Sequence, residues 1–549
     1  QANTVINAPI SDKAAVKLNY LHTEREELVE NNGAGENFGM KDNDSVVLDL
    51  RLDATDTFSI DYRYEKAWGD SSQRLEQTTK VAPGALTFFT EITQATSDRL
   101  DDVTPFREIM QNDLEIDAHT LFLTWEASDN LTVKSITAWR ELDNEYFSDP
   151  LATAVGDYTL IGRGTGAPSY AVSNAEFEQF SQEIQVLGNT DNLEYVVGLY
   201  YYEDESSQDA AGSSSLGVPR PTDFSEAEND SLAVFGQFTY IPQLMDQRWQ
   251  LTVGGRYSED QRKAFRNNAS VGFVGNYDED FSNFTPSLTV GFDINDDMNV
   301  YGKVVSGFKS GGTSQRSANE ELFARGFDEE DILSYELGFK GDFWDRRARL
   351  NMAAFYMELD GLQASVQTGA TPGQRDLLPI DNTTLKGFEF DLTLLLTEGL
   401  SLRFDYGYLD TELGEDSLDS PVGTFFFVDV MSYAPESNYT LSLDYSLPLD
   451  NGALDFNVNY AYQDEVSTSI NSSDNTIIDD YSVWGAAVTW SNITLGSIPG
   501  DLKLTLWGKN LGDEEYGIIA TGAWGVFGAS EVTTFGDPRS YGLTVSYDY

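Results

Sequence analysis

The nine residues 400–408, with the sequence LSLRFDYGY, alternate between apolar or aromatic side chains and polar ones. In an extended chain, leucine, phenylalanine and tyrosine would occupy one face, while Ser401, Arg403, Asp405 and Gly407 would occupy the other. A period of two is typical of a β-strand, whereas an amphipathic helix repeats every 3.6 residues. The stretch therefore predicts a strand that separates an apolar medium from water.

The same alternation occurs on either side, at 386–394 and 454–462. One interpretation is a soluble β-sandwich, but strands in soluble folds run about 5–6 residues and many of these segments are longer. A tilted membrane strand needs ~9–11 residues to cross the hydrocarbon. Slipping the 400–408 strand by one position would turn Arg403 toward lipid. Near the midplane, this would destabilise the barrel by roughly 2–4 kcal/mol. The pattern predicts an all-β protein, a transmembrane antiparallel β-barrel with a wet lumen.

The connections between these segments alternate between short and long. Short connections carry turn residues, as at 191–192, 295–297 and 450–452. Long polar stretches lie between them, for example at 263–280 and 309–329. Short turns at one end and long loops at the other are typical of bacterial outer-membrane barrels. We expect the turns to face the periplasm and the loops to face the outside.

The number of strands between these connections is about 21, from 2–10 to 534–549. Single-chain bacterial barrels have even strand numbers, because the first and last strands must pair antiparallel. The sequence therefore predicts a barrel of the 22-stranded type, with about 21 strands present and one missing before Gln1. Barrels of that width hold a plug in the lumen. We expect no plug within residues 1–549, because no globular segment separates from the strand pattern.

Composition excludes several classes of protein. The 34 basic and 91 acidic residues give a net charge of −57, which argues against a nucleic-acid surface. The chain has no cysteine, which excludes disulfides and thiolate zinc sites. It has only two histidines, His22 and His119, which is too few for a histidine-rich metal site. No apolar run approaches the ~20 residues of a membrane helix. We expect no enzyme activity, no cofactor and no metal site.

Several short motifs follow one another along the chain in a fixed order. The clearest are VYGKVVSGFKSGG at 300–312, SYELGFK at 334–340, LKGFE at 385–389, LWGKNL at 506–511 and GDPRSYGL at 536–543. Together they resemble the barrel of the TonB-dependent receptor family, over nearly the whole of residues 1–549. The resemblance implies a 22-stranded bacterial outer-membrane barrel that imports a scarce, large nutrient, commonly a ferric siderophore.

The same resemblance implies partners. In the family a plug closes the lumen and couples to the TonB complex through a TonB box, while lipid and lipopolysaccharide surround the wall. The present residues differ from the family pattern, because signal peptide, TonB box, plug and first strand are not recognisable in them. Two other functions stay open at this point: a passive porin-like channel, and a structural scaffold barrel in a larger assembly.

The C-terminal residues form one more candidate feature. In the family a terminal aromatic residue belongs to the signal for the barrel-assembly machinery, and an interfacial aromatic girdle is an equally simple explanation. The residues that would share this face are Tyr541, Leu543, Val545, Tyr547 and Tyr549.

Cations are scarce in the acidic loops, so the loop arginines are candidates to bind an anionic ligand by charge-assisted hydrogen bonds. Loop aromatic residues are candidates to stack on a siderophore. The alternative is that these residues pack the loops together or pair with neighbouring carboxylates. The candidates are Arg163, Arg220, Arg266, Arg316, Arg325, Arg375, Phe425, Phe426, Phe427 and Trp524.

Overall fold

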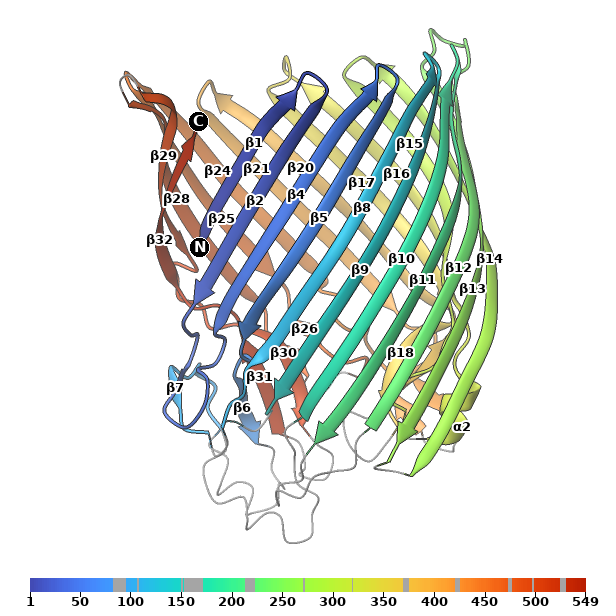
Figure 1. Cartoon of the computed structure of the whole chain (residues 1–549), viewed down its shortest axis with the longest axis vertical. Coiled ribbons are helices and arrows are strands. Elements are labelled where there is room, and N and C mark those ends of the chain that lie inside the picture. Colours follow the sequence, from blue (N-terminus) through green and yellow to red (C-terminus); the bar gives the residue numbers. More distant parts are fainter. Residues whose placement is uncertain are drawn as a thin grey trace.

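A single antiparallel sheet of 21 tilted strands forms a barrel-shaped wall (Figure 1). Every strand of the wall pairs with the next one along the chain, as the meander pattern predicts. The computed structural model describes residues 1–81, 95–105, 108–149, 152, 171–212, 223–269, 272–317, 319–368, 375–419, 425–471, 476–495, 498–523 and 530–549. The wall strands are β1 Ala2–Ser11, β2 Ala14–Arg25, β4 Lys41–Thr55, β5 Phe58–Ser71, β8 Asn112–Ser128, β9 Leu131–Ser148, β10 Ala171–Asn189, β11 Leu193–Gly212, β12 Asp223–Tyr240, β13 Trp249–Asn268, β14 Phe273–Asn295, β15 Met298–Lys309, β16 Glu330–Phe343, β17 Ala348–Asp360, β20 Thr383–Thr397, β21 Leu400–Glu412, β24 Ser437–Leu449, β25 Gly452–Gln463, β28 Tyr481–Leu495, β29 Ile498–Lys509 and β32 Ser540–Asp548.

Side chains on neighbouring strands confirm that the wall has one polar and one aromatic face. On the polar face, Asn351 of β17 donates a hydrogen bond to Asp391 of β20 at 3.0 Å. On the opposite face, the rings of Phe390 and Phe404 lie 5.5 Å apart on β20 and β21. Because partners across antiparallel strands share a face, the period-two pattern is carried from strand to strand. The strand predicted at 400–408 is therefore the middle of β21.

The predicted alternation of connections is confirmed. Short turns join the strands at one end of the wall and long connections join them at the other (Figure 1). In the turn after β14, the side chain of Asn295 accepts a hydrogen bond from the backbone N–H of Asp297 at 2.9 Å. Such local bonds explain why Asn and Asp occur in these turns.

The long connections contain more regular structure than the sequence predicted. The polar stretch 263–280 is not a loop, because β13 and β14 continue through most of it as one long hairpin. The stretch 309–329 contains a helix, α2 Glu320–Arg325, and 530–535 forms a separate strand, so the last wall strand begins at Ser540. The other loop elements are β3 Glu30–Asn31, β6 Glu76–Val81, β7 Asp102–Val103, β18 Leu362–Gln367, β19 Arg375–Ile380, β22 Ser417–Asp419, β23 Phe425–Phe427, β26 Val466–Ser467, β27 Ile477–Ile478, β30 Gly517–Ala523 and β31 Ser530–Phe535.

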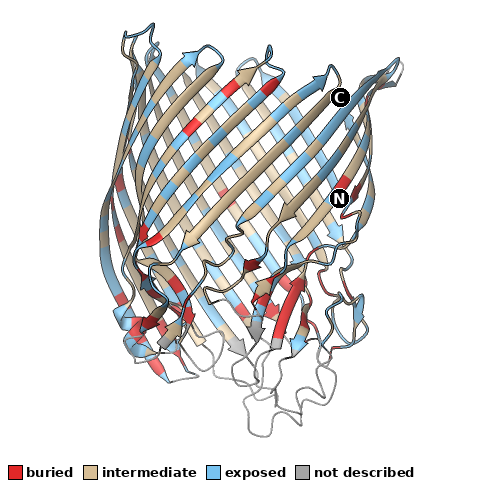
Figure 2. Ribbon diagram, turned by 180° about the vertical axis from the view of Figure 1, so that it is seen from behind, coloured by how far each residue is buried: buried red, intermediate tan, exposed pale blue. Residues whose placement is uncertain are grey.

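The large buried side chains gather mainly at the long-loop end of the wall (Figure 2). Phe38, Phe323 and Ile380 are fully buried there, in separate apolar clusters. The wall instead exposes large apolar side chains, such as Leu337 and Leu506. This is the distribution expected when lipid contacts one face of the sheet and water fills the lumen. No helix in the described part of the chain is long and apolar enough to cross a membrane.

The first and last strands of the wall do not pair with each other. Within the described residues β1 pairs only with β2, and β32 pairs only with β29. A sheet of 21 antiparallel strands leaves these two edge strands running in the same direction. At the long-loop end, however, β6 pairs with β31 and completes the three-stranded sheet β30-β31-β6. The N-terminal and C-terminal parts of the wall are therefore joined at this rim.

Candidate functional site

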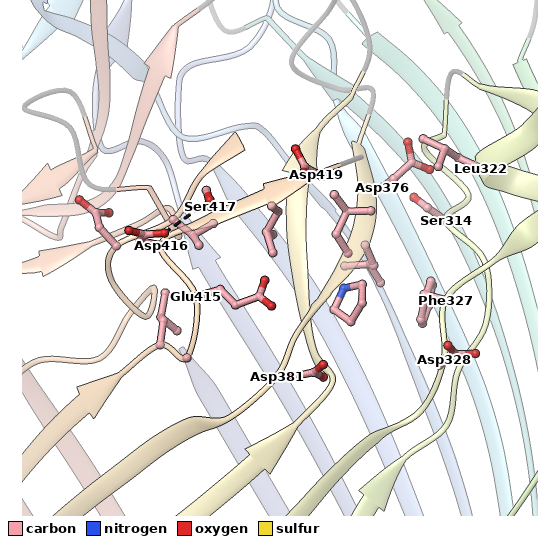
Figure 3. Close-up of a pocket in the computed structure, with 18 of the residues that line it drawn as sticks. Ser314, Leu322, Phe327, Asp328, Asp376, Asp381, Glu415, Asp416, Ser417 and Asp419 are labelled. Atoms are coloured by element: carbon pink, nitrogen blue, oxygen red, sulfur yellow. Dashed lines mark hydrogen bonds between the residues drawn. The ribbon is translucent and has the colours of Figure 1, made fainter. Parts of the chain in front are cut away.

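A cavity of about 1180 Å³ lies among the loop elements at the long-loop end of the wall (Figure 3). Its lining comes from α2 and the residues after it, from β19, from the end of β21, and from β22. These segments belong to three successive long connections of the chain. The cavity is larger than the ~300–1,000 Å³ typical of small-molecule pockets. It is the candidate ligand-binding site.

An apolar cluster holds two of the cavity walls in place. In the hairpin β18–β19, Ala364 and Val366 alternate with polar residues and share one face with Leu378 and Ile380, and all four are buried. Leu418 of β22 and Val428 pack on the same cluster. The loops between β17 and β20 and between β21 and β24 thus share one small core.

Helix α2 forms another part of the lining. Asn319 caps its first turn, because the Asn319 side chain accepts a hydrogen bond from the backbone N–H of Leu322 at 3.0 Å. Phe323 is fully buried against β14, where it contacts Phe273 and Tyr277. This packing fixes the orientation of the helix, and Leu322 and Arg325 line the cavity.

Carboxylates dominate the charged groups of the lining. Eight acidic residues and one basic residue, Arg325, are among the residues that line the cavity. In Figure 3 the labelled carboxylates come from several sides, with Asp376 and Asp419 near one edge and Asp381 near the opposite edge. The acidic residues are Asp328, Asp376, Asp381, Glu412, Glu415, Asp416, Asp419 and Asp429.

Four of the arginines named from the sequence lie in the described residues. Arg325 is exposed and lines the cavity. Arg266 is 3% exposed, near the end of β13, and its Nη2 donates to Asp223 Oδ2 at 2.7 Å. Arg266 is therefore part of a buried ion pair, and its Nε and Nη1 have no hydrogen-bond partner among the described residues.

Arg316 and Arg375 lie side by side next to the cavity. The backbone N–H of Arg375 donates to the carbonyl of Arg316 at 3.1 Å, and the hydroxyl of Ser314 donates to the carbonyl of Arg375 at 2.6 Å. Burial lowers the pKa of Arg375, and the neighbouring charge of Arg316 lowers it further. The structure thus brings Arg316 and Arg375 together, with Arg325 on the cavity lining.

The aromatic candidates have different surroundings. Phe425, Phe426 and Phe427 form β23, which pairs with β22. The side chain of Phe426 packs against the apolar cluster, whereas Phe427 is 67% exposed. Three further candidates, Arg163, Arg220 and Trp524, lie outside the described residues. A ligand contact of any of these residues stays a prediction.

The acidic lining was missed as a site in the sequence, although a signal was present. The run 328–331 is acidic, and the segment 412–419 contains four acidic residues in eight positions. Such runs are usually solvated loop, so the acidic residues alone do not indicate a site. What the sequence does not reveal is that both segments contribute to the lining of the same cavity, where the shared apolar core holds Leu418 of the second segment.

One group of side chains has the residue types of a metal site. His22 Nδ1 lies 3.1 Å from Asp44 Oδ1 and 3.8 Å from Asp42 Oδ1, across the paired strands β2 and β4. The hydroxyl of Tyr20 donates to Asp44 Oδ1 at 2.6 Å. The sequence predicted no metal site, and this group is the one place in the described residues where three such ligand groups converge.

The C-terminal face is present as predicted. Tyr541, Leu543, Val545, Tyr547 and Tyr549 are all exposed, and the first four lie on one face of β32. Their part in barrel assembly stays a prediction.

Comparisons with known proteins agree with this architecture. The ferric-pyoverdine 358 receptor of Pseudomonas putida is 22% identical over 465 residues, which are 78% of this chain and 51% of that receptor. The chain thus spans about half the length of the curated relative it matches. The crystal structure of the ferric yersiniabactin uptake receptor FyuA from Yersinia pestis superposes with a TM-score of 0.80 at 16% identity, covering 100% of this chain and 77% of FyuA.

A second solved structure gives the same result. The siderophore receptor PiuA from Acinetobacter baumannii superposes with a TM-score of 0.71 at 16% identity, over 99% of this chain and 78% of PiuA. These structural likenesses establish the fold. The sequence model of the family described as "TonB dependent receptor-like, beta-barrel" matches residues 19–511. The chain therefore belongs to the TonB-dependent receptor family, as a β-barrel of the outer membrane of a Gram-negative bacterium.

Proposed function

We propose that the protein is an active importer that captures a ferric siderophore or a similar iron complex in the loop cavity and passes it through the barrel. The observation that carries this proposal is the cavity of about 1180 Å³ at the long-loop end of a TonB-dependent receptor barrel. Its size suits a metal chelate, and three connections of the chain contribute to its lining. The family consists of transporters and receptors, and we propose no catalytic step for this member.

Energy for import would come from the TonB complex acting on a plug inside the lumen. An open barrel of this width would leak, so a plug is the simplest way to make passage depend on energy. Around the wall, outer-membrane lipid and lipopolysaccharide would cover exposed apolar side chains such as Leu337, Leu506 and Phe284.

Iron uptake by whole cells tests the function. Cells that carry the gene, and matched cells from which it has been deleted, would be given radioactive ferric siderophores under iron limitation. We expect uptake that requires the gene and stops when the proton-motive force is dissipated. Uptake that continues without energy would favour the passive channel, and the absence of any gene-dependent uptake would contradict the import of iron complexes.

A further inference from the structure

The charge of the cavity lining differs from that of the chain as a whole. Eight of the 22 lining residues are acidic, compared with 91 of the 549 residues of the chain. The acidic fraction of the lining is therefore about twice the average of a chain that is already strongly acidic. Among the described residues of this lining, Arg325 is the one that is basic.

Most of these carboxylates are not neutralised by neighbouring cations. Within the described residues Glu412, Glu415, Asp416 and Asp419 form no ion pair with a lysine or arginine. The same is true of Asp328, Asp376 and Asp381, although Asp376 also interacts electrostatically with the buried Arg266. Asp381 accepts a hydrogen bond from the backbone N–H of Gly361 at 3.1 Å, which leaves its negative charge in place. An anion that entered the cavity would meet uncompensated negative charge.

Part of the remaining lining is apolar. Phe327, Leu377, Leu378 and Pro379 lie between the acidic residues. Low-dielectric walls focus the field of the carboxylates into the cavity, which favours entry of one sign of charge. A ligand that fits this lining carries positive charge together with apolar surface.

We propose that the cavity selects iron complexes of net positive charge, such as a chelate with a protonated amine, over anionic ones. This inference rests on the proposed function and names the substrate class of the same site. Neighbouring arginines do not reverse the sign. Arg266 is paired with Asp223 and does not line the cavity. Arg325 together with the adjacent Arg316 and Arg375 brings three positive charges against eight carboxylates. The −57 net charge of the chain adds a long-range field of the same sign.

A series of ligands that differ only in charge tests the proposal. Ferrioxamine B, a ferric trihydroxamate with a free amine, is cationic, its N-acetyl derivative is neutral, and its N-succinyl derivative is anionic. Binding to the purified full-length protein in detergent would be measured by fluorescence quenching at low salt. We expect affinity to fall about tenfold with each step from cation to anion, and the differences to shrink as salt is raised.

A variant of the lining identifies the carboxylates responsible. The triple variant Glu415→Gln, Asp416→Asn, Asp419→Asn removes three exposed lining charges, so the fold should be unaffected. We expect it to lose most of the preference for the cation. The matched control removes three exposed charges at the short-turn end and should keep the preference; its substitutions are Asp129→Asn, Asp191→Asn and Asp450→Asn.

The outcomes separate this inference from the proposed function. Equal or tighter binding of the anionic derivative, an unchanged preference in the lining variant, or no binding of any of the three complexes would overturn charge selection. Gene-dependent iron uptake by cells would still support import in each of those cases. Loss of that uptake would instead contradict the proposed function itself.

Discussion

Asp513 ties two segments of the long-loop end together through its carboxylate. The backbone N–H of Arg539 donates to Asp513 Oδ1 at 3.1 Å, and Arg99 Nη2 lies 3.3 Å from the same oxygen. The backbone hydrogen bond, followed by the charges of Arg539 and Arg99, holds the pKa of Asp513 below its ordinary value. A carboxyl group whose pKa is lowered in the folded protein stabilises the folded loop at any pH above its ordinary pKa. This stabilisation is lost as the pH falls through the pKa of the folded state.

The substitution Asp513→Asn tests this contact. Asparagine tolerates the positive φ of 56° at this position, so the turn should remain. We expect faster hydrogen exchange of the loop around 510–516 at pH 7, after correction for intrinsic rates. Acidification below pH 3.8, the ordinary value of the carboxyl group, should loosen the wild-type loop and change the variant little. The neighbouring substitution Glu514→Gln is the control, and an equal effect of both would contradict a specific role of Asp513.

Individual residues of the site were predicted from the sequence only in part. Arg325 was named because cations are scarce in the loops, and it lines the cavity. Arg266 was named for the same reason, yet it pairs with Asp223, 43 positions away. Sequence spacing does not reveal such a partner, because the register of β12 against β13 brings the two together.

Among the elements, helix α2 is held in position by one buried side chain, that of Phe323. Phe323 is fully buried against β14, next to Phe273 and Tyr277. Truncating a buried phenylalanine removes about 3–5 kcal/mol of packing energy in a well-ordered core. We therefore expect Phe323→Ala to detach α2 and raise its hydrogen exchange, with the ligand bound more weakly because the part of the cavity wall formed by Leu322 is displaced.

The melting temperature of the wall should not change in Phe323→Ala, since α2 lies outside the sheet. Glu321→Ala, at an exposed position of the same helix, is the matched control. Loss of the whole barrel fold in Phe323→Ala, or an equal loss of ligand affinity in both variants, would contradict this assignment.

Each wall strand has a lipid face and a lumen face, and β16 allows both to be tested. Leu337 is 66% exposed on the apolar face of β16, whereas Ser334 lies on the opposite face. An arginine on the lipid face near the midplane destabilises a barrel by roughly 2–4 kcal/mol. We expect Leu337→Arg to fold less completely in liposomes than Ser334→Arg, as measured by the heat-dependent shift in gel mobility. Equal folding of the two variants would contradict the assigned register.

The elements of the wall were predicted well because their signal is local. Alternation along one strand and turn residues at 295–297 or 450–452 are visible in a short window of sequence. The hairpin β18–β19 was not predicted, because its pairing brings together two short segments within a stretch that is polar on average. Its buried residues become apparent only when Leu418 and Val428 from another connection complete the cluster.

At the scale of the whole molecule, loop contacts join the two ends of the sheet where the edge strands do not pair. Asp537 Oδ1 accepts from Arg74 Nη2 at 2.7 Å, and Asp537 Oδ2 lies 3.9 Å from Arg25 Nη1. Arg74 also donates to the carbonyl of Phe535 at 3.3 Å. Together with the pairing of β6 and β31, these contacts form a bridge between β2 and the segment before β32. The ends of the chain lie close to the same side of the wall in both views (Figures 1 and 2).

This bridge should limit the distance between the edges of the sheet at the long-loop end. The chain has no cysteine, so spin labels at Glu24→Cys and Ser540→Cys would report that distance alone. Asp537→Asn weakens the contacts to Arg74 and Arg25, so we expect a broader distance distribution. The barrel should remain folded, because each exposed ion pair contributes only about 0–1 kcal/mol to stability. Asp548→Asn removes the 3.0 Å pair with Lys503 between β29 and β32, away from the bridge, and should leave the distribution unchanged. No broadening in Asp537→Asn would mean that the β6–β31 pairing alone holds the rim, and equal broadening in both variants would contradict a specific role of the bridge.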